Sequence, residues 1–208
     1  MNRFFLTRLL FVIPCLLLLA KEASAQSQPK VEWGVYEMLT RAYSWEDRLD
    51  QAVKDFGVNP QFVLFFRDLN PQRGFPSNQV ETANAHNMTP VISLEISRWG
   101  RGKDTGYLEE VADGSFDDFF RQWAENAKTY GLPLILRFGF EMNGDWFPWG
   151  SQPETFVTAW RRTHKIFKEV GCENVKWMFS PNVLWDKRTE KKDFYNYYPG
   201  AAYVDMIG

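Results

Sequence analysis

The residues best suited to chemistry lie in one stretch, 134–150. An apolar run, Leu134–Phe138, leads into a short loop that carries Glu141, Asn143 and two tryptophans. A carboxyl group that leaves a buried strand into an aromatic loop is partly desolvated, and desolvation favours its protonated form. Such an acid can protonate a glycosidic oxygen. The stretch therefore predicts Glu141 as a general acid for glycosidic cleavage, and the alternative is a purely structural ion pair with Arg137.

The two tryptophans of this loop, Trp146 and Trp149, are the second part of that prediction. Flat aromatic rings pack well against the apolar faces of sugar rings, and their indole N–H groups can still hydrogen-bond. We therefore expect both side chains to contact a saccharide near Glu141. The rest of the chain must supply the elements that hold this loop in place.

Six short apolar runs alternate with helical patterns along the chain. Their length and their content of Val, Ile, Phe and Leu are typical of strands buried on both faces. The runs are Val31–Tyr36, Phe62–Phe66, Val91–Glu95, Leu134–Phe138, Val175–Phe179 and Tyr203–Ile207. Helices are expected from a capping box at Ser44 to Gly57, over Asn78–His86, from Ser115 to Gly131, and from Pro153 to Gly171.

This alternation predicts an α/β fold with a parallel sheet and crossover helices. No GxGxxG follows the first run, which argues against a dinucleotide-binding doubly wound sheet. The repeat is about 34 residues, so eight repeats approach the roughly 250 residues of a (β/α)8 TIM barrel. We expect an incomplete (β/α)8 barrel of about six units, truncated at the C-terminus and part of a longer gene product.

Composition narrows the class of protein. Lys+Arg is 24 and Asp+Glu is 26, and the near balance argues against a nucleic-acid partner or a polybasic membrane-surface protein. The 9 Trp, 8 Tyr and 18 Phe are far too many for a disordered chain. His86 and His164 lie in helical patterns as packing or surface residues, so no metal site is expected.

The first 25 residues resemble a secretory signal peptide. Basic residues precede the apolar run Leu9–Ala20, and the small residues Ala23 and Ala25 suit a cleavage site after Ala25. The apolar run is too short to span a bilayer, which needs about 20 residues. We expect a secreted or periplasmic protein whose domain covers 26–208 and keeps a single, buried cysteine, Cys172.

The stretch from Arg137 to Trp149 closely resembles the acid/base motif of glycoside hydrolase family 26, the β-mannanase family. Two further stretches agree in order and spacing. Asn174–Asn182 is similar to the family's fifth strand, and Tyr198–Gly208 is similar to its approach to the sixth. The resemblance covers roughly 31–208.

This resemblance implies a (β/α)8 barrel and retaining hydrolysis of a β-linked polysaccharide, such as β-mannan, without a cofactor. Glu141 falls on the acid/base position, and Trp146 on an aromatic residue near the cleaved bond. Arg137 is expected to hold the carboxylates, and Asn143 to shape the loop or contact sugar. Outside the motif, Glu95 ends the third strand and is expected to contact sugar or Arg137.

Trp99, just after the third strand, is expected to be a sugar platform. The sequence also departs from the family in two ways. Phe140 stands where mannanases of the family usually have His, so a glucan, a xylan or an exopolysaccharide competes with mannan as substrate. The family's nucleophile is a Glu at the end of the seventh strand, beyond this chain, so we expect the 208 residues alone to be inactive. A catalytically inactive, polysaccharide-binding relative is the remaining alternative.

Overall fold

The computed structural model describes residues 32–37, 44–98, 106–182 and 194–208. The fold below is that of the compact unit Trp33–Gly208. Trp99, the signal peptide and Val31, at the start of the first expected strand, lie outside the described residues. Among the helices that can be described, none combines the length and apolar character needed to cross a membrane.

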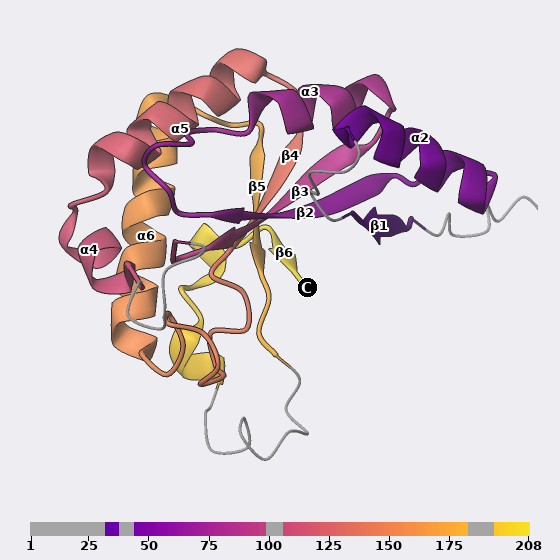
Figure 1. The fold of residues 1–208 in the computed structure, drawn as a ribbon. Helices are drawn as coiled ribbons and strands as arrows, with labels where there is room; N and C mark the ends of the chain where they lie inside the picture. Colours follow the sequence, from indigo (N-terminus) through magenta and orange to yellow (C-terminus); the bar gives the residue numbers. More distant parts are fainter. Residues whose placement is uncertain (1–31, 38–43, 99–105, 183–193) are drawn as a thin grey trace, which may run out of the picture. The chain divides into compact units, whose positions relative to one another are not determined.

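Six parallel strands form one sheet, and their spatial order follows the chain, β1 to β6 (Figure 1). The strands are β1 Gly34–Tyr36, β2 Phe62–Asp68, β3 Thr89–Glu95, β4 Leu134–Phe138, β5 Val175–Phe179 and β6 Met206–Ile207. Neighbours that pair consecutively and in parallel are the pattern of a (β/α)8 barrel, since a doubly wound sheet reverses its order at a switch point. The sheet is the first six units of such a barrel, which confirms the predicted fold class.

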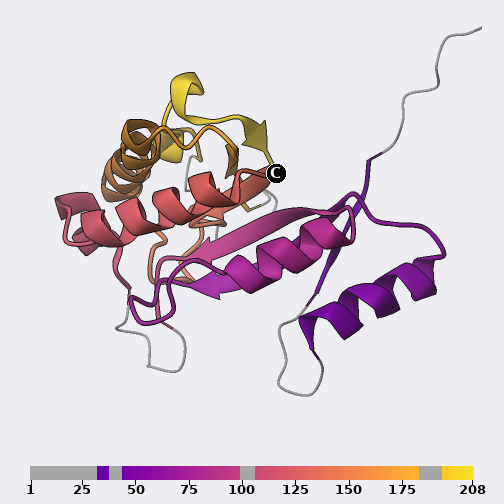
Figure 2. The same ribbon diagram turned by 90° about the horizontal axis from the view of Figure 1, so that it is seen from above.

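The connecting helices lie on the outer face of this sheet (Figures 1 and 2). They are α2 Trp45–Phe56, α3 Ser77–Ala85, α4 Leu108–Asp113, α5 Asp117–Tyr130 and α6 Pro153–Val170. The capping residues explain several boundaries. The Ser44 hydroxyl accepts the Asp47 N–H at 3.0 Å, and Gly57 and Gly171 end their helices in the left-handed conformation.

Aromatic packing separates the two faces of the sheet. On the outer face, Trp160 of α6 contacts Phe138 of β4 and Trp177 of β5, with ring centroids 5.6 and 5.5 Å apart. On the inner face, Phe66 of β2 packs edge-on against Phe140 at 5.2 Å. Arg137 also lies on the inner face, where it bonds to side chains of neighbouring strands. The outer face therefore holds the core, and the inner face carries polar groups toward the strand ends.

One expected helix boundary was wrong. Ser115 does not open a helix: its N–H and hydroxyl donate to the Asp113 carboxylate at 2.8 and 2.7 Å, and α5 begins at Asp117. Gly114, with φ of 103°, ends the unexpected helix α4 just before it. The left-handed Gly114 thus separates two helices, α4 and α5, where the sequence pattern predicted the start of a single helix.

The last strand is also shorter than expected. A 3₁₀ turn, η2, occupies Ala201–Tyr203, and only Met206–Ile207 pairs with β5. The Asp205 carboxylate accepts the backbone N–H of Trp177 at 2.9 Å, so a side chain takes the place of a ladder bond at this point. Between β5 and η2 the described part of the crossover contains a second 3₁₀ turn, η1 Phe194–Tyr197.

Candidate active site

Glu141 follows β4 in an uncommon backbone conformation. Its φ is 53°, in the left-handed region that residues with a Cβ seldom adopt and that costs about 1–3 kcal/mol. Two hydrogen bonds hold it there. The Glu141 N–H donates to the Ser180 carbonyl at 2.8 Å, and the Gly144 N–H donates to the Glu141 carbonyl at 3.0 Å. The end of β5 and the loop after β4 together fix the direction of this carboxylate.

The side chain of Glu141 is half-buried and bonded to Trp146. The indole Nε1–H donates to Glu141 Oε2 at 2.9 Å. The indole folds back over Gly144 so closely that a Cβ there would collide with the six-membered ring of Trp146. Glycine at this position therefore allows the ring to reach the carboxylate, and the bond leaves Oε1 for another partner.

Arg137 lies in β4, four residues before Glu141, and its side chain is on the inner face of the sheet. Its Nε donates to Ser180 Oγ at 2.9 Å and its Nη1 to Ser93 Oγ at 3.3 Å, and both serines are buried. The guanidinium carbon lies 4.4 Å from the centre of the Phe140 ring. Burial lowers the pKa of Arg137, and the nearby Glu141 carboxylate raises it. An arginine remains charged under these opposing effects, so the site contains a fixed cation.

This placement refines the expected role of Arg137. Its hydrogen bonds within the described residues go to the two serine hydroxyls, and its effect on Glu141 is electrostatic. Ser93 and Ser180 were not singled out from the sequence. The usable signal was a lone serine inside the apolar run of β3 and another directly after β5.

Asn143 is fully buried and joins two loops. Its Nδ2 donates to the Asn182 carbonyl at 3.2 Å, and its Oδ1 accepts the Asn182 N–H at 2.7 Å. This pair of bonds ties the loop after β4 to the loop after β5. Of the two roles expected for Asn143, the geometry matches loop shaping, since its amide is already satisfied by backbone.

Trp149 also lies inside the protein, in contrast to the expected contact with substrate. It has no exposed surface, its Nε1–H donates to the Phe140 carbonyl at 2.8 Å, and its ring stacks on Phe147 at 4.4 Å. Phe140 is 3% exposed and contacts both rings. The correction has a simple cause: the loop must bury apolar side chains to hold its own shape, and Trp149 serves that purpose.

Two further carboxylates lie at neighbouring strand ends. Glu95 ends β3 and is in register with Asp68, which ends β2. Asp68 is almost fully buried and accepts a 3.2 Å bond from Arg73. Asp68 was missed in the sequence because it follows a run that already looked complete at Phe66. Within the described ranges, no group of three or more His, Cys, Asp or Glu residues is placed to hold a metal ion.

Comparison with known proteins shows which family this chain resembles. The family model described as Glycosyl hydrolase family 26 matches residues 82–208. A mannan endo-1,4-beta-mannosidase A and B of Caldalkalibacillus mannanilyticus is 28% identical over 188 residues, covering 79% of this chain and 33% of the relative. Endoglucanase H of Acetivibrio thermocellus is 35% identical over 103 residues, covering 46% of this chain and 11% of the relative. The chain thus spans a third or less of the length of these two relatives.

Solved structures agree on the fold. A GH26 beta-mannanase from Bacteroides ovatus has a TM-score of 0.59 at 17% identity, covering 86% of this chain and 61% of that one. The endo-beta-mannanase/endo-beta-glucanase of Prevotella bryantii has a TM-score of 0.63 at 17% identity, covering 85% of this chain and 32% of that one. The family match extends over more than half of the sequence and includes β4, Glu141 and β5. The chain belongs to glycosyl hydrolase family 26.

Proposed function

We propose that this chain forms part of the catalytic domain of a glycosidase that cleaves a β-linked polysaccharide such as β-mannan. The observation that carries the proposal is the Glu141 carboxylate, held beyond the end of β4 in a left-handed conformation, bonded to the Trp146 indole and close to the Arg137 cation. Strained residues held by surrounding bonds cluster at active sites. Active sites of (β/α)8 barrels lie at this end of the strands.

In this proposal Glu141 is the acid/base of a retaining mechanism. It gives its proton to the leaving oxygen as the glycosidic bond breaks, and a second carboxylate forms the covalent glycosyl intermediate. Glu141 then takes a proton from the attacking water, which releases the sugar. Trp146 keeps one carboxylate oxygen engaged, so the other faces the leaving group. We expect the nucleophile on a strand beyond Gly208, so residues 1–208 alone should not turn over substrate.

The test is Glu141→Ala in the full natural chain, assayed on β-mannan. General acid catalysis contributes roughly 10²–10⁴-fold, so kcat should fall by that amount. On an aryl glycoside with a good leaving group, the first step needs little acid assistance, and the variant should accumulate the glycosyl intermediate. Added azide should then restore turnover and yield a glycosyl azide of retained configuration, because azide needs no general base.

Glu173→Ala is the matched control, since Glu173 is an exposed carboxylate in the loop before β5, at the opposite ends of the strands. Its activity should equal that of the parent protein. Unchanged cleavage by Glu141→Ala would remove Glu141 from the acid/base role. A protein that binds polysaccharide but releases no reducing ends, with or without substitution, would instead be an inactive binding relative.

Cleavage of another β-linked polysaccharide, such as a glucan, is the second candidate, because Phe140 stands where mannanases of the family usually have His. This side chain is buried among Phe66, Phe147 and Trp149, and it offers no hydrogen bond to a sugar hydroxyl. Two of the similar proteins carry endoglucanase or endo-beta-glucanase in their names. Initial rates on β-mannan, β-glucan, xylan and exopolysaccharide, compared at equal weight concentrations, decide between these substrates.

We also propose that the protein is exported with removal of residues 1–25. The basic start, the short apolar run and the small residues before Gln26 support this. N-terminal sequencing of the protein from culture fluid or periplasm should begin at Gln26. Recovery of an intact Met1 from those fractions would contradict the cleavage.

A further inference from the structure

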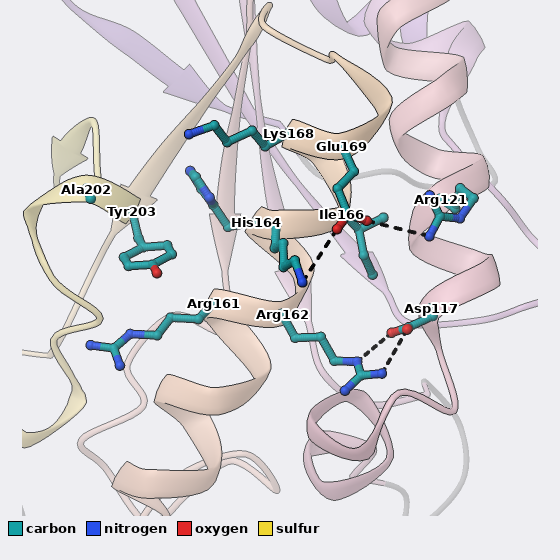
Figure 3. Close-up of a pocket in the computed structure, with 11 residues that line it drawn as sticks. Asp117, Arg121, Arg161, Arg162, His164, Ile166, Lys168, Glu169, Ala202 and Tyr203 are labelled. Atoms are coloured by element: carbon teal, nitrogen blue, oxygen red, sulfur yellow. Dashed lines mark hydrogen bonds and ion pairs between the residues drawn. The ribbon is translucent and has the colours of Figure 1, made fainter.

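A pocket that does not include Glu141 lies beside the C-terminal half of α6 (Figure 3). Its volume is about 550 Å³, within the range of small-ligand sites. α6 runs from the Glu141 loop back to the start of β5, so the pocket lies toward the opposite ends of the strands. It is bordered by α5 on one side and by η2 on the other, where no α-helix of the described crossover covers α6.

The charges that line this pocket are unequal. Five Lys or Arg side chains line it against two carboxylates. Both carboxylates are already engaged. Asp117 accepts two bonds from Arg162, at 2.7 and 2.9 Å, and Glu169 pairs with Lys165 at 3.6 Å and more loosely with Arg121. Positive charge therefore remains in the part of the pocket that faces η2.

Arg161 and Lys168 supply that remaining charge. Within the described ranges neither forms an ion pair with a carboxylate, whereas the other three cations of the pocket do. Arg161, His164 and Lys168 are three and four residues apart, so they share one face of α6. Figure 3 shows these three side chains extending to the same side, toward Tyr203. We call Arg161, His164, Lys168 and Tyr203 the basic groove.

Arg161 is held in place before any ligand arrives. Its Nε donates to the Pro199 carbonyl at 2.8 Å, and its guanidinium lies 5.4 Å from the Tyr203 ring centre. The two Nη groups form a planar fork, which matches the oxygens of a carboxylate or phosphate. A side chain that is already ordered loses little entropy on binding, so this fork is suited to an anion.

His164 adds a group that responds to such an anion. Its ring packs against Trp177 and Tyr203, each with centroids 5.2 Å away. Burial lowers the pKa of His164, Lys168 lowers it further, and Asp205, before β6, raises it. A bound negative charge would favour the protonated ring. Tyr203 is only partly buried and offers a flat surface beside the cations.

We propose that the basic groove is a binding site for an oxyanion, separate from the Glu141 site. The ligand would be either a free phosphate-like ion or the carboxylate of an acidic saccharide. Arg161 and Lys168 would bind the oxygens, and a sugar ring, where present, would lie on Tyr203. The proposal does not depend on the activity assigned to Glu141, because it rests on a different set of residues.

The test is calorimetric titration of the full natural chain, at low salt, with inorganic phosphate and separately with oligogalacturonate. Neutral manno-oligosaccharide is the uncharged comparison, measured in the Glu141→Ala variant so that substrate is not consumed. We expect saturable binding of at least one anion. Charge-assisted hydrogen bonds are strong enough that Arg161→Gln or Lys168→Gln should each weaken it about tenfold. Binding of phosphate alone identifies a free-ion site, and tighter binding of the oligosaccharide identifies a glycan site.

Lys54→Gln is the matched control, because Lys54, like Lys168, is an exposed lysine in the last turn of a helix, α2, and lies outside the groove. It should leave the affinity unchanged. Arg161→Lys keeps the charge but loses the fork, and it should give intermediate weakening if the Gln variant fails to fold. Absence of saturable binding of either anion up to about 10 mM would overturn the proposal. Equal weakening by Lys54→Gln and Lys168→Gln would overturn it as well.

Discussion

The indole N–H of Trp146 donates to the carboxylate of Glu141 at 2.9 Å, five residues away across a loop that has Gly144 at its centre. The ring therefore has two distinct properties, a hydrogen-bond donor directed at the carboxylate and a flat surface. In the proposed mechanism the donor orients Glu141 and the surface contacts sugar. Substitutions that remove only one of them should separate the two effects.

Trp146→Phe removes the donor and keeps an aromatic ring. We expect kcat to fall about 10- to 100-fold, because a carboxylate that is free to rotate is misplaced for proton transfer. The KM should change by less than about threefold, since most of the ring surface remains. Trp146→Ala should lower kcat and raise KM together. Steady-state kinetics on the preferred polysaccharide measure both, and an unchanged kcat in Trp146→Phe would show that the bond does not orient the acid.

Gly144→Ala tests the same geometry from the backbone. The added methyl group would collide with the Trp146 ring, so the indole should move away from Glu141. We expect a loss of kcat similar to that of Trp146→Phe and a destabilisation of about 1–3 kcal/mol from overcrowding. The double variant Gly144→Ala/Trp146→Phe should lose little more activity than either single variant. Full additivity of the two losses in kcat would mean that Gly144 acts through something else.

The strands and the family could be predicted because they depend on local patterns. Four runs of apolar residues matched strands to within two residues at each end, and the loop from Arg137 to Trp149 carried a long, specific motif. The alternation of these runs with amphipathic segments was enough to fix the parallel order. These features can be predicted from the sequence because the burial of an apolar strand depends mainly on its own composition.

The loop interior could not be predicted in the same way. From the sequence alone, Trp146 and Trp149 are equally good candidates for contact with a sugar. In the fold, part of Trp146 is exposed and Trp149 is completely buried. That difference arises from contacts with Phe140 and Phe147 and from the left-handed turn at Glu141. The serine contacts of Arg137 are likewise made across neighbouring strands, where sequence spacing carries no information.

Ser180→Ala should disturb the Arg137 cation. It removes the acceptor of the Arg137 Nε–H, while the backbone bond from Glu141 to residue 180 can persist. A charged donor left without its acceptor costs at least about 1–3 kcal/mol, which should appear as a lower urea midpoint. Activity should fall as well, because the cation near Glu141 loses its fixed position. Ser77→Ala, at an exposed serine at the start of α3 and outside the Arg137 contacts, is the comparison for both measurements.

Cys172 should be unreactive while the protein is folded. Its side chain is 7% exposed, its thiol donates to Asn174 Oδ1 at 3.4 Å, and burial raises the pKa of the thiol to about 11. The reactive thiolate is therefore scarce at pH 8. Ellman's reagent should react with Cys172 at least about 100-fold more slowly in the native protein than in urea. Equal rates before and after unfolding would contradict this burial.

His164 should make the folded state less stable in mild acid. Burial lowers the pKa of His164 below its usual 6.5, so the unfolded chain takes up this proton at a higher pH than the folded one. Its contribution is complete above pH 6.5 and is lost as the pH falls through the folded pKa. The urea midpoint should therefore decline from pH 7 toward pH 5, and His164→Phe should reduce this decline. His164→Gln, which keeps a polar side chain but cannot take up a proton, should reduce the decline as well. If both variants follow the parent protein, His164 does not carry the effect. Phosphate should also raise the pKa of His164, measured from the pH dependence of its ring resonances in NMR spectra. Such a rise would connect this histidine to the basic groove.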